Sequence, residues 1–404
     1  MNKDLFPALL LAFVNVLGFS LLIPVLPFIV EQYGLSQIWY GILLSSYAGA
    51  LFFGAPILGA LSDVFGRKPL LIISQVGTLF SWVLFAIAYF LPADIILFAL
   101  PLPVIVILLS RLLDGVTGGN NSVVQAFVSD VTKPKDRARA FGLIGATFGV
   151  GFMIGPVLGG LTSQTSIGYL GTVLFAAILS LITLVCLFYF LPERNVHRRG
   201  GDWKVYVLKR LNVFQTIWAY RTRPIIGSAL AVKFLVILAF ASFTSILSLY
   251  LIDRFGLSSL GIGLFLFVIG LYAVFNQTVL VGWIVDRLGS GKTIVLGSIL
   301  VAVGLIIYMF IPALALLILL SYIFSLGTNI IMPTVKSVLA NASKDTEQGE
   351  VLGADEALQS LAQATMPVLS ASLYVLFGPV VFVGYGIFIL LTATPLAIRV
   401  ARKS

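Results

Sequence analysis

The stretch Gly59-Ala60-Leu61-Ser62-Asp63-Val64-Phe65-Gly66-Arg67-Lys68 is the part of the sequence that decides the fold. It joins two long apolar runs, and its small and polar residues interrupt an otherwise hydrophobic sequence. A similar stretch, Gly282-Trp283-Ile284-Val285-Asp286-Arg287-Leu288-Gly289, recurs at an offset of 223 residues and also lies between apolar runs. The chain is therefore predicted to consist of two homologous halves.

A second pair of matching positions supports the repeat. Gly142 precedes Pro156 by 14 residues, and Gly353 precedes Pro367 by the same number. This pair has an offset of 211 residues, so the first half contains 12 more residues than the second between the two matches. We expect the additional residues in the segment 91–103.

The composition predicts an all-α integral membrane protein. Hydrophobic residues make up 59% of the chain and charged residues 10%, whereas soluble domains carry about 25% charged residues. A spanning helix needs about 20 apolar residues, so 404 residues accommodate roughly twelve spans. We expect twelve transmembrane helices in two pseudo-symmetric six-helix bundles. The apolar runs lie at about 5–30, 40–62, 69–91, 104–130, 138–163, 169–191, 225–250, 259–284, 292–310, 314–340, 350–376 and 379–398.

The distribution of Lys and Arg predicts the topology. Basic residues occupy the loops near Arg67 and Lys133 and the segment 192–224, whereas the loops on the opposite side contain only Arg254. Because cytoplasmic loops are enriched in Lys and Arg, both termini are expected in the cytoplasm of a multi-pass plasma-membrane protein. The predicted organisation is an N-terminal half at 1–191, a basic cytoplasmic linker at 192–224 and a C-terminal half at 225–404.

Several classes of function are excluded by the sequence. Cys186 and His197 are the only residues of their kinds, so we expect no metal site, no Ser-His-Asp chemistry and no enzyme. The net charge of +9 lies in short loops and not on one polar face, so no nucleic acid partner is expected. The segment Gly289–Thr293 resembles the end of a phosphate-binding loop, but Asp286 stands where that motif requires glycine. We therefore expect no nucleotide and no cofactor.

Three motifs together resemble the major facilitator superfamily. The stretch 59–68 resembles the signature loop between helices 2 and 3 of that family, and Arg111-Leu-Leu-Asp114-Gly115 resembles its helix 4 signature with Asp114 in place of the usual Gln. The similarity extends over the whole chain and is greatest to the twelve-helix tetracycline and multidrug exporters. The helix 5 pattern that marks antiporters in the superfamily is matched by Gly142, Gly151, Gly155, Pro156, Gly159 and Gly160, which we call the antiporter motif.

The resemblance implies a conformational latch at one end of the helices. A carboxylate at Asp63 favours the positive N-terminal end of a neighbouring helix and can pair with a nearby arginine. Such a latch would hold the cytoplasmic side shut, and the alternative is a solvated cluster that affects topology only. The predicted latch residues are Gly59, Asp63, Gly66, Arg67, Lys68, Asp130 and Arg139.

The chain departs from the tetracycline exporters at their titratable positions. Those exporters carry acids in helices 1 and 3 and a histidine in helix 8, where this chain has Asn15, Ser81 and, approximately, Ala273. Proton coupling is therefore expected to use other ionisable residues within the spans, which are costly and for that reason candidate functional groups. The candidates are Arg111, Asp114, Lys336, Asp355 and Glu356.

The candidate ionisable groups also have structural explanations. Lys336 lies at a level similar to Asp355 and Glu356, so one acid can neutralise Lys336 and the other can carry a proton. A structural ion pair at the membrane edge is the alternative. Arg111 and Asp114 are spaced for pairing on one helix face, either as an interfacial pair or on the transport path.

Polar and aromatic residues on seven of the predicted spans indicate a central cavity for an amphipathic organic molecule. Each residue alone also fits an interhelical hydrogen bond or a packing contact, and Lys233 also fits a side chain that extends to the membrane surface. The cavity candidates are Asn15, Phe19, Tyr47, Asn120, Asn121, Lys233, Phe243, Tyr272, Asn276, Gln277, Asn329, Gln359 and Gln363.

Three functional hypotheses follow from these residues. The leading one is a monomeric secondary transporter that exports a hydrophobic or amphipathic small molecule across the lipid membrane, driven by the proton gradient. The alternative is transport of a small organic anion, with Arg111, Lys233 and Lys336 as carboxylate partners. A sensor or scaffold that retains the fold without transport is the third.

Overall fold

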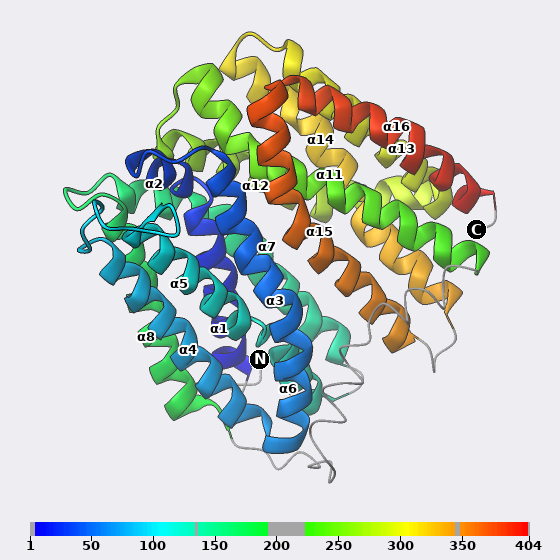
Figure 1. Cartoon of the computed structure of the whole chain (residues 1–404). Coiled ribbons are helices and arrows are strands. Elements are labelled where there is room, and N and C mark those ends of the chain that lie inside the picture. Colours follow the sequence, from blue (N-terminus) through cyan, green and yellow to red (C-terminus); the bar gives the residue numbers. More distant parts are fainter. Residues whose placement is uncertain (1–4, 134–135, 193–222, 344–347, 403–404) are drawn as a thin grey trace. The chain divides into compact units, whose positions relative to one another are not determined.

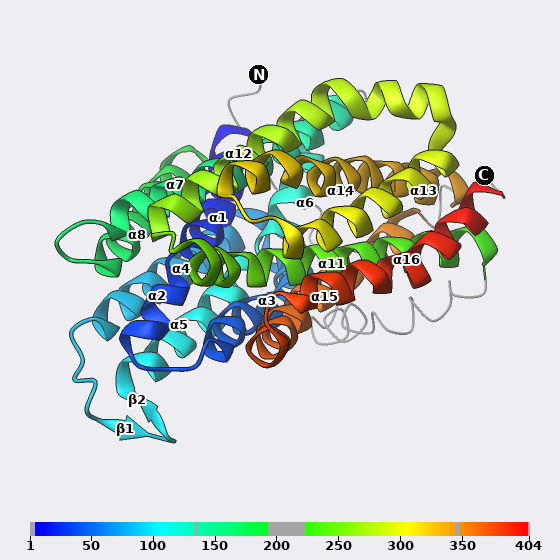
Figure 2. The same cartoon turned by 90° about the horizontal axis from the view of Figure 1, so that it is seen from above.

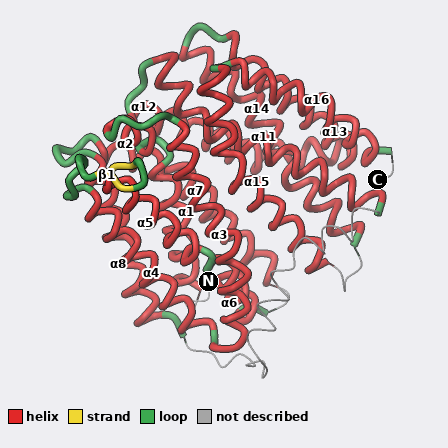
Figure 3. The backbone as a smooth tube through the Cα atoms, viewed as in Figure 1, coloured by secondary structure: helices red, strands yellow, loops and turns green. Residues whose placement is uncertain are grey.

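The computed structural model describes residues 5–133, 136–192, 223–343 and 348–402, and these residues are almost entirely helical (Figures 1 and 3). Within them, eleven helices are long and apolar enough to cross a membrane. One of these, Ser259–Phe310, has 52 residues, which is enough for two spans. Its backbone leaves the helical conformation at Gly289, so two spans meet there. The prediction of an all-α membrane protein is confirmed.

The first of two compact units comprises Met1–Leu211 and Leu257–Leu266. Most of the predicted linker, residues 193–222, lies outside the described residues, so the predicted division at 192–224 stays a prediction. The helices of this unit are α1 (Leu5–Leu22), α2 (Leu26–Gln32), α3 (Ile38–Phe65), α4 (Arg67–Ala88), α5 (Leu102–Gly118), α6 (Asn121–Val131), α7 (Arg137–Ser163), α8 (Tyr169–Phe190) and the beginning of α12 (Ser259–Phe275).

The second unit comprises Asn212–Gly256 and Phe267–Ser404. A short π-helix, η2, follows α12 and inserts an extra residue per turn into the helical path. The elements of this unit are α11 (Pro224–Phe255), the remainder of α12, η2 (Asn276–Leu280), α13 (Val281–Phe310), α14 (Leu314–Ala342), α15 (Gln348–Phe377) and α16 (Val380–Ala401).

The repeated motif forms the same turn in both units. Gly66, between α3 and α4, has φ 99° and ψ 156°, and Gly289, inside α13, has φ 74° and ψ 160°. A side chain is disfavoured at these positive φ values, whereas glycine adopts them readily. The sequence repeat therefore corresponds to a repeated backbone conformation that reverses or redirects the chain between two spans.

Two spans predicted as continuous are interrupted. The first stops at Leu22, and Pro24 and Pro27 follow, which lack the backbone N–H that a helix interior requires. The fourth consists of α5 and α6, which are separated at Gly119 and Asn120. At this break, the Asn120 side chain accepts a hydrogen bond from Asn15 of α1 and donates one to Ser74 of α4, so polar contacts accompany the local loss of helical order.

The segment 91–103 forms a short hairpin that projects beyond the ends of α4 and α5 (Figure 2). Strand β1 (Ile96–Leu97) pairs antiparallel with β2 (Leu100–Pro101), with Ile96 opposite Pro101 and Leu97 opposite Leu100. This segment is the one in which the repeat analysis expects the additional residues of the first half.

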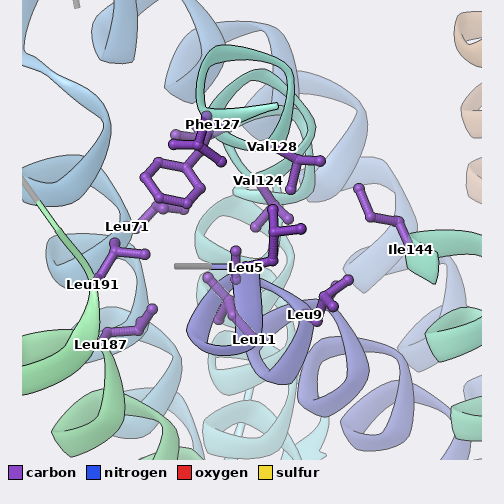
Figure 4. Packing of buried hydrophobic residues seen from close by; sticks show 14 of the residues in the cluster. Leu5, Leu9, Leu11, Leu71, Val124, Phe127, Val128, Ile144, Leu187 and Leu191 are labelled. Carbon is purple, nitrogen blue, oxygen red and sulfur yellow. The ribbon is translucent and has the colours of Figure 1, made fainter. Parts of the chain in front are cut away.

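An apolar cluster holds together the end of the first unit that carries Arg67 (Figure 4). It joins the beginning of α1 and α4 to the end of α6 and α8, with α7 alongside. Burial of these side chains fixes the helix ends from which the latch residues project. The labelled members are Leu5, Leu9, Leu11, Leu71, Val124, Phe127, Val128, Ile144, Leu187 and Leu191.

Candidate functional site

The predicted latch residues Asp63, Arg67 and Asp130 meet at the end of α3. Arg67 Nη1 lies 2.6 Å from Asp63 Oδ1, and Arg67 Nε donates a hydrogen bond of 3.1 Å to Asp130 Oδ2. The turn at Gly66 places Arg67 at the beginning of α4, where it reaches both α3 and α6. One guanidinium thus connects three helices, and its function as a latch remains a prediction.

The other latch candidates occupy separate places. Gly59 is buried on α3, one turn before Asp63. Lys68 Nζ donates a hydrogen bond of 3.1 Å to the carbonyl oxygen of Phe188 at the end of α8. The side chain of Arg139 lies outside the described residues.

Three glycines of the antiporter motif pack directly against α1. A Cβ atom on Gly159 would collide with the carbonyl group of Leu21, and one on Gly155 would collide with the Ser20 side chain. A Cβ on Gly151 would lie 3.3 Å from Val16. Ser20 Oγ also donates a hydrogen bond of 3.0 Å to the carbonyl oxygen of Gly151. The absence of side chains on this face of α7 therefore allows two helix backbones to approach closely.

Of the remaining motif residues, Pro156 and Gly160 lie in a second helix interface, and Gly142 does not. A Cβ on Gly160 would meet the backbone of Leu260, and one on Gly263 would meet the backbone of Pro156, so the beginning of α12 packs closely against α7. Ser163 and Ser259 share a hydrogen bond of 2.7 Å in the same interface. Among the described residues, no other helix comes within 4 Å of the position that a Cβ would take on Gly142, so this packing does not explain that glycine.

Asn15, Asn120 and Asn121 form a hydrogen-bonded amide cluster inside the first unit. Asn15 Nδ2 donates to Asn120 Oδ1 at 2.6 Å and to Asn121 Oδ1 at 3.3 Å. Asn120 Nδ2 donates in turn to Ser74 Oγ at 2.9 Å, so α1, α4 and the break between α5 and α6 are connected. Asn15 therefore makes an interhelical contact, and its predicted role in a cavity stays a prediction.

Arg111 and Asp114 form an ion pair inside the bundle of the first unit. Arg111 Nη1 lies 3.1 Å from Asp114 Oδ2, and their side chains are 2% and 7% exposed. The guanidinium carbon of Arg111 lies 4.6 Å from the ring centre of Trp82 and 5.2 Å from that of Phe85. Among the described residues, Arg111 Nε and Nη2 have no hydrogen-bond partner. The pair is thus buried within the bundle, and the choice between a place at the membrane boundary and a place on the transport path stays a prediction.

Two further residues surround this pair. Ser81, which the resemblance aligns with an acid of the exporters, interacts with the Asp114 carboxylate. Tyr47 is buried nearby on α3, and its ring stacks on Phe19 with 5.1 Å between centroids. The predicted cavity residues Phe19 and Tyr47 thus adjoin the Arg111–Asp114 pair through α3.

A second buried ion pair joins α11 and α15 in the second unit. Lys233 Nζ contacts Asp355 Oδ2, and the two side chains are 6% and 2% exposed. The alternative that Lys233 extends to the membrane surface is therefore wrong, since its ammonium group lies against an acid inside the unit. Asp355 was predicted to lie beside Lys336, but its ion-pair partner is Lys233.

Lys336 pairs with the neighbouring acid, Glu356. The distance from Lys336 Nζ to Glu356 Oε1 is 3.6 Å, and both side chains are more than half exposed. Consecutive residues of a helix point about 100° apart, so Asp355 and Glu356 face different neighbours of α15. The predicted group is thus separated, because Lys336 and Glu356 form an exposed pair and Asp355 pairs instead with Lys233 inside the unit.

The polar cavity candidates of the second unit lie near η2. Gln277 Nε2 donates to Asn329 Oδ1 at 3.0 Å, and Tyr272 Oη donates to the carbonyl oxygen of Ile318 at 3.2 Å. Asn276 is fully buried, and within the described part of the chain neither of its amide atoms has a hydrogen-bond partner. Short π-helical segments occur frequently at functional sites, and a buried amide without a partner is an exception in native structures.

The last three cavity candidates differ in their surroundings. Phe243 packs in an aromatic cluster with Tyr308, Phe324 and Phe382, so it belongs to the core of the second unit. Gln359 and Gln363 are half-buried on α15, one and two turns after Asp355. Their spacing places them on the same side of α15 as Asp355.

Sequence reasoning missed the rings around Arg111 and the partner of Lys233. Trp82 and Phe85 are three residues apart on α4, a spacing that puts both on one face, but nothing local assigns that face to Arg111. Lys233 lies nine residues after the start of α11 and Asp355 seven after the start of α15, so a comparison of depths would have suggested their pairing.

Comparisons with known proteins agree with this architecture. A family model described as Major Facilitator Superfamily matches residues 8–354 and 278–403. The chain belongs to the major facilitator superfamily. Class C tetracycline resistance protein from Escherichia coli is 31% identical over 367 residues, covering 89% of this chain and 87% of that protein. The class B protein from the same organism is 29% identical, covering 93% and 89%.

Solved structures of the superfamily share the fold. The crystal structure of the human organic anion transporter MFSD10 (TETRAN) has a TM-score of 0.72 at 24% identity, covering 98% of this chain and 99% of that one. A bacterial homologue of the human lysosomal transporter Spinster, in an inward-facing and occupied conformation, has a TM-score of 0.74 at 12% identity, with 99% and 96% covered. This superfamily member is thus a multi-pass membrane transporter, which is not a class of enzymes.

Proposed function

We propose that the chain is a proton-coupled exporter of hydrophobic or amphipathic organic compounds. The observation that carries this proposal is the Lys233–Asp355 pair, a carboxylate held almost fully inside a membrane-spanning bundle by a cation on another helix. Intramembrane acids are costly and mark proton pathways in transporters. Similarity to tetracycline resistance proteins over about nine-tenths of the chain supports export as the direction.

The pair suggests how a proton would act on the helices. Asp355 neutralises the Lys233 ammonium when it is ionised, and a proton on the carboxylate would remove that neutralisation. Lys233 would then be an unpaired buried charge, which favours a rearrangement of α11 relative to α15 or entry of water. Protonation and helix movement would thereby be coupled without any bound cofactor. The proposed transporter is a monomer of the plasma membrane with both termini in the cytoplasm.

Inside-out membrane vesicles test this proposal. Respiration acidifies the vesicle lumen and quenches the dye ACMA, and a compound that is exchanged for protons restores the fluorescence. We expect recovery when ethidium, tetraphenylphosphonium or tetracycline is added to vesicles containing the protein, and none with the Asp355→Asn variant inserted at an equal level. Absence of recovery with every compound, from protein shown to be folded, would contradict export and favour the non-transporting alternative.

A second candidate function, transport of organic anions, is favoured by the edge of Arg111 that has no hydrogen-bond partner among the described residues. Nε and Nη2 form the side-on fork of the guanidinium, the geometry that binds a carboxylate through two parallel hydrogen bonds. Trp82 and Phe85 beside that group would pack against an aromatic acid. In the same vesicles, this function predicts proton movement with benzoate or salicylate that disappears in Arg111→Lys, which keeps the charge without the fork.

A further inference from the structure

One face of α4 is apolar and exposed along its whole length. Every third or fourth residue contributes to it, as expected for one side of a helix. In a membrane protein such a face contacts the acyl chains of the lipid. Its members are Ile73, Val76, Phe80, Val83 and Ile87.

The exposed apolar surface continues past the end of α4 onto the hairpin. Phe90, Ile95, Ile96 and Leu97 are all exposed, and Asp94 is the only charged residue of the segment 91–103. The two strands differ in their surroundings, since the residues of β1 are exposed whereas those of β2 are buried against the unit. The hairpin therefore presents one apolar strand outward at the end of the bundle opposite Arg67.

The tip of the hairpin holds a phenylalanine in a strained turn. Phe98 and Ala99 have φ values of 52° and 62°, the left-handed conformation that two-residue hairpin turns require. Asn-Gly suits this turn, whereas residues with larger side chains adopt it at a steric cost. Phe98 nevertheless occupies it and is 93% exposed, so strain is maintained at a position that places an aromatic ring away from the protein.

We propose that this hairpin is a lipid anchor that inserts Phe98 into the membrane interface at the end of the first unit opposite Arg67. Aromatic rings favour this layer of the bilayer. The hairpin pairing and the hydrogen bond from Leu102 N to the carbonyl oxygen of Ile95 satisfy part of the backbone, which makes contact with lipid tolerable. Continuity with the lipid-facing side of α4 favours lipid over a soluble protein partner.

Spin-label accessibility in liposomes tests the insertion. A Cys186→Ala background removes the native thiol, and single cysteines then replace Phe98, Phe80 on the lipid-facing side of α4, and Ser36, an exposed residue in the turn before α3. We expect the ratio of oxygen to nickel-chelate accessibility at position 98 to exceed that at position 36 severalfold and to lie below that at position 80, which is nearer the middle of the spanning helix α4. A ratio like that at position 36, or low accessibility to both reagents as in a protein interface, would overturn the proposal.

A second variant separates the ring from the turn. Phe98→Asn combined with Ala99→Gly supplies the residues that the turn prefers and removes the aromatic group. We expect equal or higher thermal stability in detergent, but a severalfold lower accessibility ratio for a label introduced by Ile96→Cys in liposomes. An unchanged ratio at position 96 would show that Phe98 does not anchor the hairpin.

Discussion

The two units neutralise a buried basic residue in different ways. In the first, Arg111 pairs with Asp114 on the same helix, and Trp82 and Phe85 of α4 lie beside the guanidinium. In the second, Lys233 on α11 pairs with Asp355 on α15, so the charge pair itself joins two helices. The first pair therefore lies within one helix, whereas the second lies between two helices.

Only one of the two pairs would be broken by a movement of one helix relative to another. Residues three apart on α5 stay together whatever their neighbours do, because the helix itself fixes their separation. The Lys233–Asp355 contact persists only while α11 and α15 keep their present spacing and rotation. We therefore assign the coupling of protonation to conformation to the second unit, and a static or ligand-binding role to Arg111.

The largest effect is expected when the interhelical pair loses one member. Lys233→Met should lower the free energy of unfolding by about 3–5 kcal/mol, because it leaves Asp355 as an unpaired buried carboxylate. Thermal unfolding in detergent measures the loss. Lys336→Met, which breaks the exposed pair with the neighbouring residue Glu356 of α15, is the matched control and should change the melting temperature little.

A smaller loss is expected from breaking the pair on one helix. Asp114→Asn should cost about 2 kcal/mol, because the ring faces of Trp82 and Phe85 continue to attract the guanidinium after its counter-charge is removed. Combining Asp114→Asn with Trp82→Leu should increase the loss beyond the sum of the single effects. Additive effects would show that the rings do not stabilise Arg111.

Reversal of the interhelical pair should have a still smaller effect. The double change Lys233→Asp with Asp355→Lys restores opposite charges across the same interface, so we expect a net loss of about 1 kcal/mol against the much larger losses of the single variants. Comparison of the four proteins by thermal unfolding gives the coupling energy. Failure of the reversed pair to recover stability would mean that other groups around Lys233 or Asp355 fix the position of each charge.

The smallest effect is expected at the exposed pair. Lys336→Gln should cost no more than about 1 kcal/mol, because water screens a pair whose side chains are more than half exposed. At high salt, the free energy of unfolding of Lys336→Gln should be almost the same as that of the unaltered protein. A loss as large as that of Lys233→Met would place Lys336 in the buried network after all.

The sequence was sufficient for the fold because the signals of that fold are repeated or long. Apolar runs marked the spans, and Gly66 and Gly289 marked equivalent turns through a conformation that favours glycine. The interruptions at Pro24 and Asn120 were less evident, since a hydropathy pattern continues across a local break in hydrogen bonding.

The candidate site was less predictable because pairing depends on helix rotation. Sequence spacing placed Lys336 level with both Asp355 and Glu356, but depth along a helix does not say which side of α15 each acid faces. The same limitation applied to Asn15, whose amide partners are more than 100 residues away in the chain. Ionisable residues were identified from the sequence, whereas their partners required the packed structure.

The double variant Lys233→Gln with Asp355→Asn tests whether this ion pair couples transport to protons. It removes both charges together, so folding should recover relative to Lys233→Gln alone. Flux of an identified export substrate is then measured in proteoliposomes with and without a pH gradient. We predict a stable protein that still equilibrates the substrate down its own gradient but no longer accumulates it in response to the pH gradient. Full recovery of pH-driven accumulation in the double variant would contradict the assignment of proton coupling to this pair.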